Sequence, residues 1–229
     1  MTPPTVTPPT VTPPTVTVFD YGAGNLHSLA KAVERAGAAV RVEVDPAAAV
    51  LHTDALVLPG VGAFAAAAER PAPGRDAMRA ALADGLPALG ICLGMQLLFD
   101  ESDEGPGAGL GLLPGRVTRI RARRVPQIGW NAIEPADAVE PGVNAPNVGG
   151  PDPLVAASGL RTAYYANSFV CRPDDPAACV TAWSAHEEDR FPAVVRVGNT
   201  VGAQFHPEKS SAPGVAFVAA WVRALAGAR

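Results

Sequence analysis

The sequence predicts an α/β protein built on a doubly wound, mostly parallel β-sheet with an antiparallel extension. In the first half of the chain, short apolar or β-branched runs alternate with stretches of helical periodicity, which is the order that gives right-handed crossovers and a parallel sheet. In the second half, several such runs follow one another through short connections, which favours antiparallel pairing. The runs of the first half are 16–19, 40–44, 55–58 and 88–91.

The remaining elements are predicted from the spacing of apolar residues and from residues that typically begin or end a helix. A helix is predicted from Leu26 to Ala36, with Asn25 as its N-cap and Gly37 closing it. Further helices are predicted over 75–84, directly after Cys92, and near the C-terminus, where Pro213 lies in the first turn. The later strands are expected at 117–120, 163–166, 180–183, 194–197 and 201–205, and the proline-rich stretch 134–153 is expected to be a loop.

The N-terminal segment differs in composition from the rest. Residues 2–16 repeat Thr-Pro-Pro-Thr-Val three times, and so much proline removes backbone donors that a helix or a sheet needs. We therefore expect a disordered Thr/Pro tail over residues 1–15 and one domain over residues 16–229. The repeat lacks a basic start and an unbroken apolar run, so we do not expect a secretory signal.

Composition excludes several classes of protein. The 229-residue chain carries 18 basic and 22 acidic residues, a net charge of −4, without the basic block expected of a nucleic-acid-binding protein. No run approaches the roughly 20 apolar residues that span a bilayer, so we expect neither nucleic acid nor membrane as a partner. Three cysteines without a Cys-x-x-Cys pair indicate a reducing cytoplasmic setting rather than a disulfide framework.

The segment around Cys92 is the strongest chemical signal. An apolar strand ends in Gly90-Ile91-Cys92-Leu93-Gly94 and passes directly into a predicted helix, which is the cysteine form of a nucleophile elbow. Glycines at both flanks allow the close backbone contacts that such a sharp turn creates. A cysteine at a helix start favours the thiolate, and the Leu93 amide points to where an oxyanion would form. An isolated cysteine after a strand is more often a small core residue than a nucleophile, but the two flanking glycines favour the nucleophile here.

A candidate base lies far downstream. His206 follows a predicted strand and precedes Glu208 by two residues. Parallel strands of a doubly wound sheet end at the same edge, so His206 can face Cys92, and Glu208 can accept from the second imidazole nitrogen. The turn after the strand 55–58, Pro59-Gly60-Val61-Gly62, offers further amides for an oxyanion hole. The other histidines, His27, His52 and His186, have no ligand partners at suitable spacing, so we expect no metal site.

These motifs together resemble class I, triad-type glutamine amidotransferases. The resemblance rests on Gly-x-Cys-x-Gly at 90–94, Pro-Gly-Val-Gly-x-Phe at 59–64 and Phe-His-Pro-Glu-Lys-Ser at 205–210, in this order, over about residues 16–229. Asp-Tyr-Gly-Ala-Gly-Asn at 20–25 and Gly-Trp-Asn at 129–131 make the chain most similar to the glutaminase subunits of imidazole glycerol phosphate synthases. The resemblance implies their flavodoxin-like or Rossmann-like α/β fold.

The resemblance also implies roles. Cys92 would attack the carboxamide of glutamine, His206 would carry the proton, and Glu208 would orient the histidine. Gly62 would join Leu93 in the oxyanion hole. The residues implied to bind glutamine are Gln96, Glu104, Asn167, Ser168 and Phe169.

The partner implied is a cyclase subunit of (β/α)8 type, with which the chain would form a heterodimer and to which it would pass ammonia. Asn25, Trp130 and Lys209 fall on stretches that face that subunit in the family. No cofactor is implied. The chain departs from the family's usual pattern at two places: Asn167-Ser168-Phe169 stands for His-Ser-Tyr, and Gln127 stands for a histidine.

Three other interpretations remain. A glutaminase that serves another synthase fits the triad but not the motifs at 20–25 and 129–131. A regulatory subunit without activity would be expected to have lost Cys92, His206 or Glu208. A cysteine peptidase could use the same elbow, but no extended substrate groove is apparent in the sequence.

Overall fold

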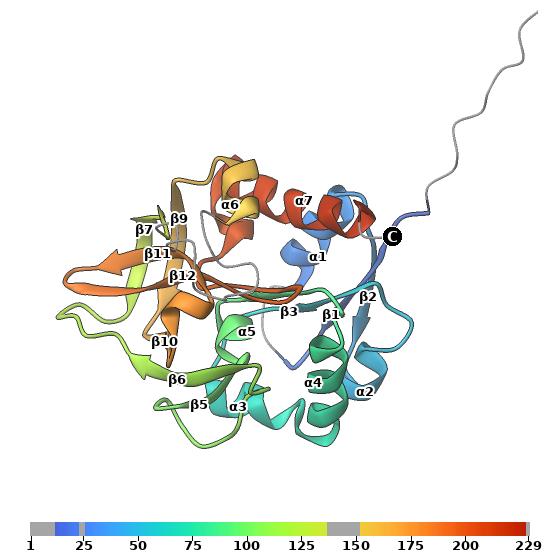
Figure 1. Ribbon diagram of the computed structural model, residues 1–229, viewed down its shortest axis with the longest axis horizontal. Coiled ribbons are helices and arrows are strands. Elements are labelled where there is room, and N and C mark those ends of the chain that lie inside the picture. Colours follow the sequence, from blue (N-terminus) through green and yellow to red (C-terminus); the bar gives the residue numbers. More distant parts are fainter. Residues whose placement is uncertain (1–11, 23–25, 137–151, 228–229) are drawn as a thin grey trace, which may run out of the picture.

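A mostly parallel β-sheet crosses the middle of the protein and carries helices on both faces (Figure 1). The computed structural model describes residues 12–22, 26–136 and 152–227. Within these residues the strand order is β2-β1-β3-β4-β13-β12-β11-β8. The strands of this sheet are β1 (Thr15–Phe19), β2 (Ala39–Glu43), β3 (Ala55–Leu58), β4 (Ala88–Ile91), β8 (Glu134–Pro135), β11 (Val180–His186), β12 (Asp189–Val197) and β13 (Thr200–Ala203).

The predicted division of this sheet into a parallel part and an antiparallel extension is confirmed. Strands β1, β2, β3, β4 and β13 pair in parallel, and β12 and β11 follow antiparallel to them. Strand β13 lies directly beside β4, with Gly202 opposite Gly90 and Ala203 opposite Ile91. The two segments that follow these strands, at Cys92 and at Gln204, therefore leave the sheet side by side.

The helices form two layers, each over its own hydrophobic core. Helices α1 (Leu26–Arg35), α6 (Pro153–Ser158) and α7 (Ser211–Gly227) cover one face, and α2 (Pro46–Ala49), α3 (Phe64–Glu69) and α4 (Arg75–Ala83) lie on the other (Figure 1). Val33, Leu154 and Trp221 belong to the first core, and Phe64 and Met78 belong to the second. A sheet buried on both faces explains why its central strands are apolar throughout rather than alternating.

Two smaller sheets stand at the end of the molecule that carries β11 and β12. One contains β10 (Phe169–Pro173), β6 (Leu113–Arg119) and β5 (Phe99–Ser102), and the other pairs β7 (Gln127–Ala132) with β9 (Thr162–Asn167). Only Ser168 separates β9 from β10, so the chain changes sheets within one residue. This corner brings residues 167–169 to the edge where the parallel strands end.

Most of the predicted elements occur, and one expectation needs correction. The helix predicted directly after Cys92 is present as the short α5 (Leu93–Gln96), and the buried turn at Leu97 and Leu98 then leads into β5, which begins at Phe99. The predicted loop 134–153 has regular structure at its two ends, in β8 and at the start of α6. Residues 137–151 of that loop, residues 1–11 of the predicted tail and the N-cap Asn25 lie outside the described residues.

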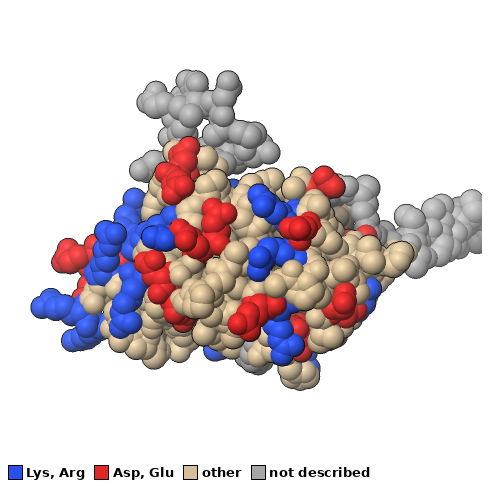
Figure 2. Space-filling view, turned by 90° about the horizontal axis from the view of Figure 1, so that it is seen from below, with Lys and Arg blue, Asp and Glu red and all other residues tan. Residues whose placement is uncertain are grey.

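Charge is mixed over the surface. Figure 2 shows the face of the second helical layer, where acidic and basic side chains alternate and basic ones gather toward the end that carries β6 and β7. The segment between these strands carries three exposed arginines, Arg121, Arg123 and Arg124. Among the described residues, no helix has the length and apolar character needed to cross a membrane.

Candidate active site

Cys92 occupies a strained turn between β4 and α5. Its backbone φ is 50° and its ψ is −102°, a combination that residues with a side chain rarely adopt. Such strain costs about 1–3 kcal/mol and persists only where the surroundings hold it. The Cys92 amide donates to the carbonyl of Ala203 at 2.6 Å, which ties the turn to the neighbouring strand. The elbow predicted from the sequence is therefore present.

The two flanking glycines are required by space. A Cβ atom on Gly94 would lie 1.9 Å from the carbonyl oxygen of Leu58, and one on Gly90 would lie 2.7 Å from the carbonyl oxygen of Gly94. Real Cβ atoms do not approach backbone atoms so closely, so any larger residue would push β3 and β4 apart or open the turn. The glycines hold Cys92 where it is by allowing backbone to pack on backbone.

His206 and Glu208 form a buried pair beyond the end of β13. Histidine Nδ1 and the Glu208 Oε1 atom are 2.9 Å apart, and the His206 side chain is 1% exposed. The short 3₁₀ turn Pro207–Lys209 (η3) bends the chain so that the carboxylate can reach back to the ring. The other ring nitrogen, Nε2, has no hydrogen-bond partner among the described residues. This arrangement leaves one imidazole nitrogen free for a reacting group.

The pKa of His206 is raised to about 9. Burial alone would lower the pKa, but interactions with the side chains of Cys92 and Glu208 both favour the charged ring and outweigh burial. The parallel pairing of β4 with β13 accounts for the interaction with Cys92, because the chain continues from these neighbouring strands to Cys92 and to His206. At neutral pH the imidazole is held with both nitrogens protonated.

A cavity of about 190 Å³ opens beside Cys92. This volume is below the range of roughly 300–1,000 Å³ typical of drug-sized ligands, so it suits a small metabolite. All eight predicted oxyanion-hole, substrate and nucleophile residues of this edge contribute to its wall: Gly62, Cys92, Leu93, Gln96, Glu104, Asn167, Ser168 and Phe169. Val61 of the predicted oxyanion-hole turn also lines it, and Pro126 and Ala166, for which no role is predicted from the sequence, complete it.

The glycine-rich turn after β3 forms one side of the cavity. Gly62 has a φ of 135°, which side chains disfavour, and a Cβ there would lie 3.5 Å from the Leu93 side chain. Gly62 and Leu93 thus lie close together and line the same small space. The Glu104 carboxylate accepts a hydrogen bond from the Phe64 amide at 2.8 Å, so it anchors the start of α3 just after this turn.

The opposite wall is organised around one carbonyl oxygen. The carbonyl of Phe169 accepts from Gln96 Nε2 at 3.1 Å and from Asn167 Nδ2 at 3.0 Å. Both amides are buried and both line the cavity. Gln96 comes from α5 and Asn167 from the end of β9, so this shared acceptor joins the elbow to the corner between the two small sheets.

The two departures from the family pattern lie opposite each other. In the antiparallel pair of β7 and β9, Gln127 is the direct partner of Asn167. The Gln127 side chain is 1% exposed, and neither its Nε2 nor its Oε1 has a hydrogen-bond partner among the described residues. The Asn167 Oδ1 atom also lacks one. Gln127 and Asn167 are therefore neighbours across the β7–β9 pair.

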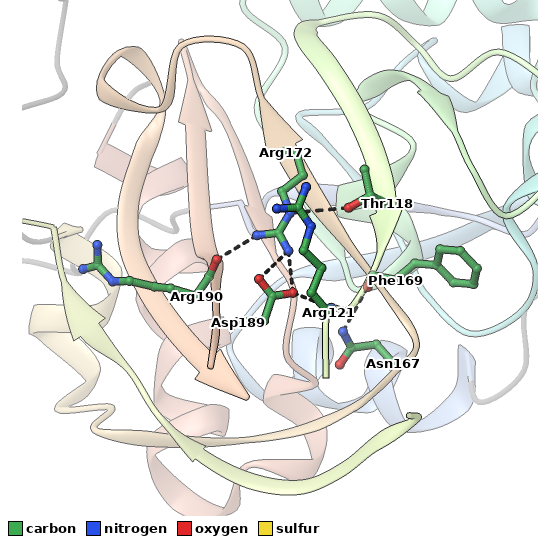
Figure 3. Close-up of polar contacts among 7 residues, drawn as sticks. All are labelled: Thr118, Arg121, Asn167, Phe169, Arg172, Asp189 and Arg190. Carbon is green, nitrogen blue, oxygen red and sulfur yellow. Dashed lines mark hydrogen bonds and ion pairs between the residues drawn. The ribbon is translucent and has the colours of Figure 1, made fainter. Parts of the chain in front are cut away.

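An ion pair behind the corner fixes the strand that supplies Phe169. Arg172 on β10 reaches Asp189 on β12, with Nη2 2.7 Å from Oδ1, and donates to the carbonyl of Arg190 (Figure 3). The Asp189 carboxylate also accepts from the Arg121 amide at 2.8 Å. Glu187, on the turn before β12, accepts from the amides of Arg123 and Arg124. The segment that ends at Pro126, on the cavity wall, is therefore held by the β11–β12 hairpin.

Two of the three predicted interface residues meet at one aromatic ring. Trp130, half exposed, packs edge-on against Tyr164 with ring centroids 6.3 Å apart, and Lys209 Nζ lies 5.9 Å from the same ring. Ile128, 68% exposed, lies two residues before Trp130 on β7. We refer to Ile128, Trp130, Tyr164 and Lys209 as the aromatic surface cluster. Asn25 lies outside the described residues.

The remaining cysteines and histidines do not join the site. Cys171 and Cys179 are buried, and burial raises the pKa of both thiols, that of Cys179 to about 12. His27 and His52 are exposed, and His186 Nε2 lies 2.8 Å from the Arg124 carbonyl. In the described parts of the chain, no three His, Cys, Asp or Glu side chains form a group that could hold a metal ion.

Comparison with known proteins agrees with this geometry. The family model for class-I glutamine amidotransferases matches residues 17–222. Solved structures with the same fold include a glutamine amidotransferase (TM-score 0.66, 20% identity, covering 93% of this chain and 98% of that one). Another is PurLQS from Thermotoga maritima (TM-score 0.64, 19% identity, covering 93% and 100%).

Curated relatives are considerably closer in sequence. The chain is 45% identical over 214 residues to the imidazole glycerol phosphate synthase subunit HisH of Symbiobacterium thermophilum, covering 90% of this chain and 92% of the relative. It is 43% identical over 224 residues to that of Deinococcus radiodurans, covering 92% and 94%. The HisH of Natronomonas pharaonis is 42% identical over 205 residues, covering 86% and 88%. The chain therefore belongs to the class-I glutamine amidotransferases and, among them, to the family of imidazole glycerol phosphate synthase subunit HisH.

Proposed function

We propose that this protein hydrolyses glutamine to glutamate and ammonia through a thioester on Cys92, and that it delivers the ammonia to a cyclase subunit in histidine biosynthesis. The observation that carries the proposal is the cavity beside Cys92, because the strained cysteine, Gly62, Leu93 and buried side-chain amides all line one small space. Family membership supplies the substrate, and the cavity fits one molecule of its size.

The first half of the reaction forms the thioester. With the proton of the thiol already held by His206, the Cys92 sulfur attacks the side-chain carbonyl carbon of glutamine, and the carbonyl oxygen takes up negative charge that the Gly62 and Leu93 amides stabilise. The C–N bond then breaks as His206 Nε2 gives its proton to the departing nitrogen, which leaves as ammonia. Glu208 holds the ring by Nδ1 and stabilises its positive charge, so the proton is already in place when the leaving group needs it.

The second half releases glutamate. His206, now neutral, takes a proton from a water molecule as the water oxygen attacks the thioester carbon. The same two amides stabilise the second oxyanion, the C–S bond breaks, and the sulfur is restored. Gln96, Glu104, Asn167, Ser168 and Phe169 form the wall that would hold the rest of the substrate, with amides suited to its polar groups.

The aromatic surface cluster is the proposed docking face for the cyclase, which we infer to be a (β/α)8 subunit that forms a heterodimer with this chain. Exposed Trp130 and Ile128 are the kind of apolar anchors that interfaces favour. The cluster is joined to the site by backbone, since the His206 amide donates to the carbonyl of Tyr164 at 2.9 Å. Ammonia released on this side would reach the partner, which would use it to form imidazole glycerol phosphate and an aminoimidazole carboxamide ribotide.

The experiment that tests the proposal separates ammonia production from its use. We expect Cys92→Ser to abolish glutamate release, because an alcohol is a far weaker nucleophile here, while the reconstituted synthase still turns over with ammonium ions. Cys179→Ser, a change at another buried cysteine, serves as the matched control and should keep glutamate release. Glutamate release by Cys92→Ser at the wild-type rate would refute the role of Cys92.

A further inference from the structure

One buried polar side chain of the site has no role in the mechanism above. Gln204 follows β13, two residues before His206, and is fully buried. Its Nε2 lies 3.6 Å from the Cys92 sulfur, a normal length for an N–H···S hydrogen bond. Its Oε1 accepts from Gln96 Nε2 at a longer 3.5 Å. Both ends of this amide therefore face residues of the site.

These contacts form a continuous chain of side-chain amides. Gln204 donates to the sulfur, Gln96 donates to Gln204, and Gln96 also donates to the Phe169 carbonyl that Asn167 shares. The chain begins at the cavity wall and ends at the sulfur. Among its links, the contact between Gln96 and Gln204 is the longest hydrogen bond to an oxygen, so it is the one most easily given up when Gln96 turns to a ligand.

The physical consequences follow from burial. A buried amide is costly unless both its polar ends are bonded, so these two contacts fix the orientation of the Gln204 side chain. An N–H donor at the sulfur favours the negative thiolate over the neutral thiol. It also restricts rotation of the Cys92 side chain, which the strained backbone alone does not do.

We propose that Gln204 is a positioning residue for Cys92, whose side-chain amide orients the sulfur and favours its anionic form, and which links the sulfur to the cavity wall through Gln96. The inference rests on the proposed role of Cys92 as nucleophile. Gln204 acts through Cys92 and does not itself line the cavity. Loss of its donor should therefore change the state of the sulfur more than the binding of substrate.

The test is the pH profile of Cys92 alkylation by iodoacetamide in the isolated protein without glutamine, followed by peptide mass spectrometry. In Gln204→Met, which keeps length and loses the donor, the midpoint of the profile should rise by about one pH unit, with alkylation about tenfold slower at its acid end. The plateau at high pH should stay within about twofold. Gln204→Glu places a negative charge at the same position and should raise the midpoint further.

Thr17→Val is the matched control. It removes the hydrogen bonds of another buried polar side chain, from Thr17 to Thr53 at 2.9 Å and from Arg41 to Thr17 at 3.2 Å, in β1, which β3 separates from β4. It should leave the alkylation profile unchanged. Unchanged profiles in both folded Gln204 variants would overturn the proposal.

Two further measurements keep the inference open to refutation. In the wild-type protein, alkylation of Cys92 should shift the side-chain amide resonances of Gln204 in a ¹⁵N NMR spectrum, and unshifted resonances would contradict the contact even if a variant fails to fold. In the reconstituted synthase, Gln204→Met should lower kcat about tenfold and leave KM within about twofold, whereas a raised KM at unchanged kcat would refute a positioning role. Wild-type protein that releases no glutamate would refute the proposed function alone, since alkylation needs no substrate.

Discussion

His206 is the residue at which burial and charge compete most directly. Its ring lies almost wholly out of solvent, yet Cys92 and Glu208 keep its pKa near 9, above the ordinary 6.5. A raised pKa in the folded state means that the folded protein binds a proton more tightly than the unfolded chain does. Stability from this proton is fully present below about pH 6.5 and is lost as the pH rises through about 9.

This linkage predicts a pH-dependent difference between wild-type protein and His206→Asn. The stability advantage of the wild type should shrink by on the order of 3 kcal/mol between pH 6 and pH 9.5, as measured by urea unfolding at each pH. His186→Asn, at a histidine outside the site, should show no comparable change. An advantage that stays constant across this range would contradict the raised pKa.

The same residue sets the rate in the proposed mechanism. We expect His206→Asn to lower kcat for glutamate release by about 10²–10⁴-fold, since general acid–base catalysis contributes that much. Glu208→Gln should lower it less, because the carboxylate only orients the ring and stabilises its charge. Steady-state assays with the partner present would measure both. Wild-type turnover by His206→Asn would require another base.

At the scale of elements, the sequence predicts the parallel core well and the corner poorly. Strands 55–58 and 88–91 and the site residues that follow them were predicted at their observed positions, because apolar runs ending in glycine-rich turns are strong local signals. Strands β7 and β10 were missed. Strand β7 contains Gly129 and Asn131, which strands disfavour, and β10 follows β9 after a single residue with no turn signal. Their formation depends on contacts distant in sequence.

The same limit applies to the site. Motifs pointed to Cys92, His206 and Glu208, but nothing local marked Pro126 as a wall residue or Gln204 as a contact of the sulfur. Pro126 reaches the cavity because the hairpin before β12 holds its segment, and Gln204 because β13 pairs with β4. Both depend on tertiary placement rather than on a recognisable pattern.

The pairing of β7 with β9 gives a prediction about stability. Because both polar atoms of buried Gln127 lack partners, Gln127→Met should raise the free energy of unfolding by about 1 kcal/mol, since it removes unpaired polar atoms and keeps the volume. Gln127→Ala leaves a cavity instead and should lower it. Urea unfolding measures both, and a loss of more than about 1 kcal/mol in Gln127→Met would show that the amide is bonded in solution.

At the scale of the whole molecule, the site and the proposed docking face share one end of the sheet. We expect glutaminase activity to be low in the isolated chain and to rise when the cyclase and its nucleotide ligand bind. A shift of Tyr164 when the partner binds the aromatic surface cluster would move His206, because the His206 amide donates to the Tyr164 carbonyl. The Gly60–Gly62 turn can also change its backbone conformation at little energetic cost, because glycine tolerates a positive φ. Equal rates for the chain alone, with the cyclase, and with cyclase and ligand would refute gating.

The docking face itself can be tested by substitution. Trp130→Ala should weaken cyclase binding by about tenfold or more, as loss of an aromatic anchor does. Val42→Ala, at an exposed apolar residue on edge strand β2 at the other side of the sheet, should leave affinity unchanged. Titration calorimetry would compare the two. Equal affinities for the two variants would show that the interface with the cyclase does not include Trp130.

The Thr/Pro repeat is predicted to be dispensable. Pairing of β1 begins at Thr15, which is opposite Ala39, so removal of residues 2–11 leaves every described strand contact in place. The shortened protein should keep the Tm and the glutamate release of the full chain. A fall in either would give the repeat a role that its composition does not suggest.

The central claim is that Cys92 carries the glutamyl group during turnover. The most direct measurement is acid quenching of the reconstituted synthase during reaction with glutamine, followed by mass spectrometry of its peptides. We predict a glutamyl group on the peptide that contains Cys92, removable by hydroxylamine as a thioester is, and absent in Cys92→Ser. Continued glutamate release with Cys92 unmodified, or with the glutamyl group on another residue, would contradict the account.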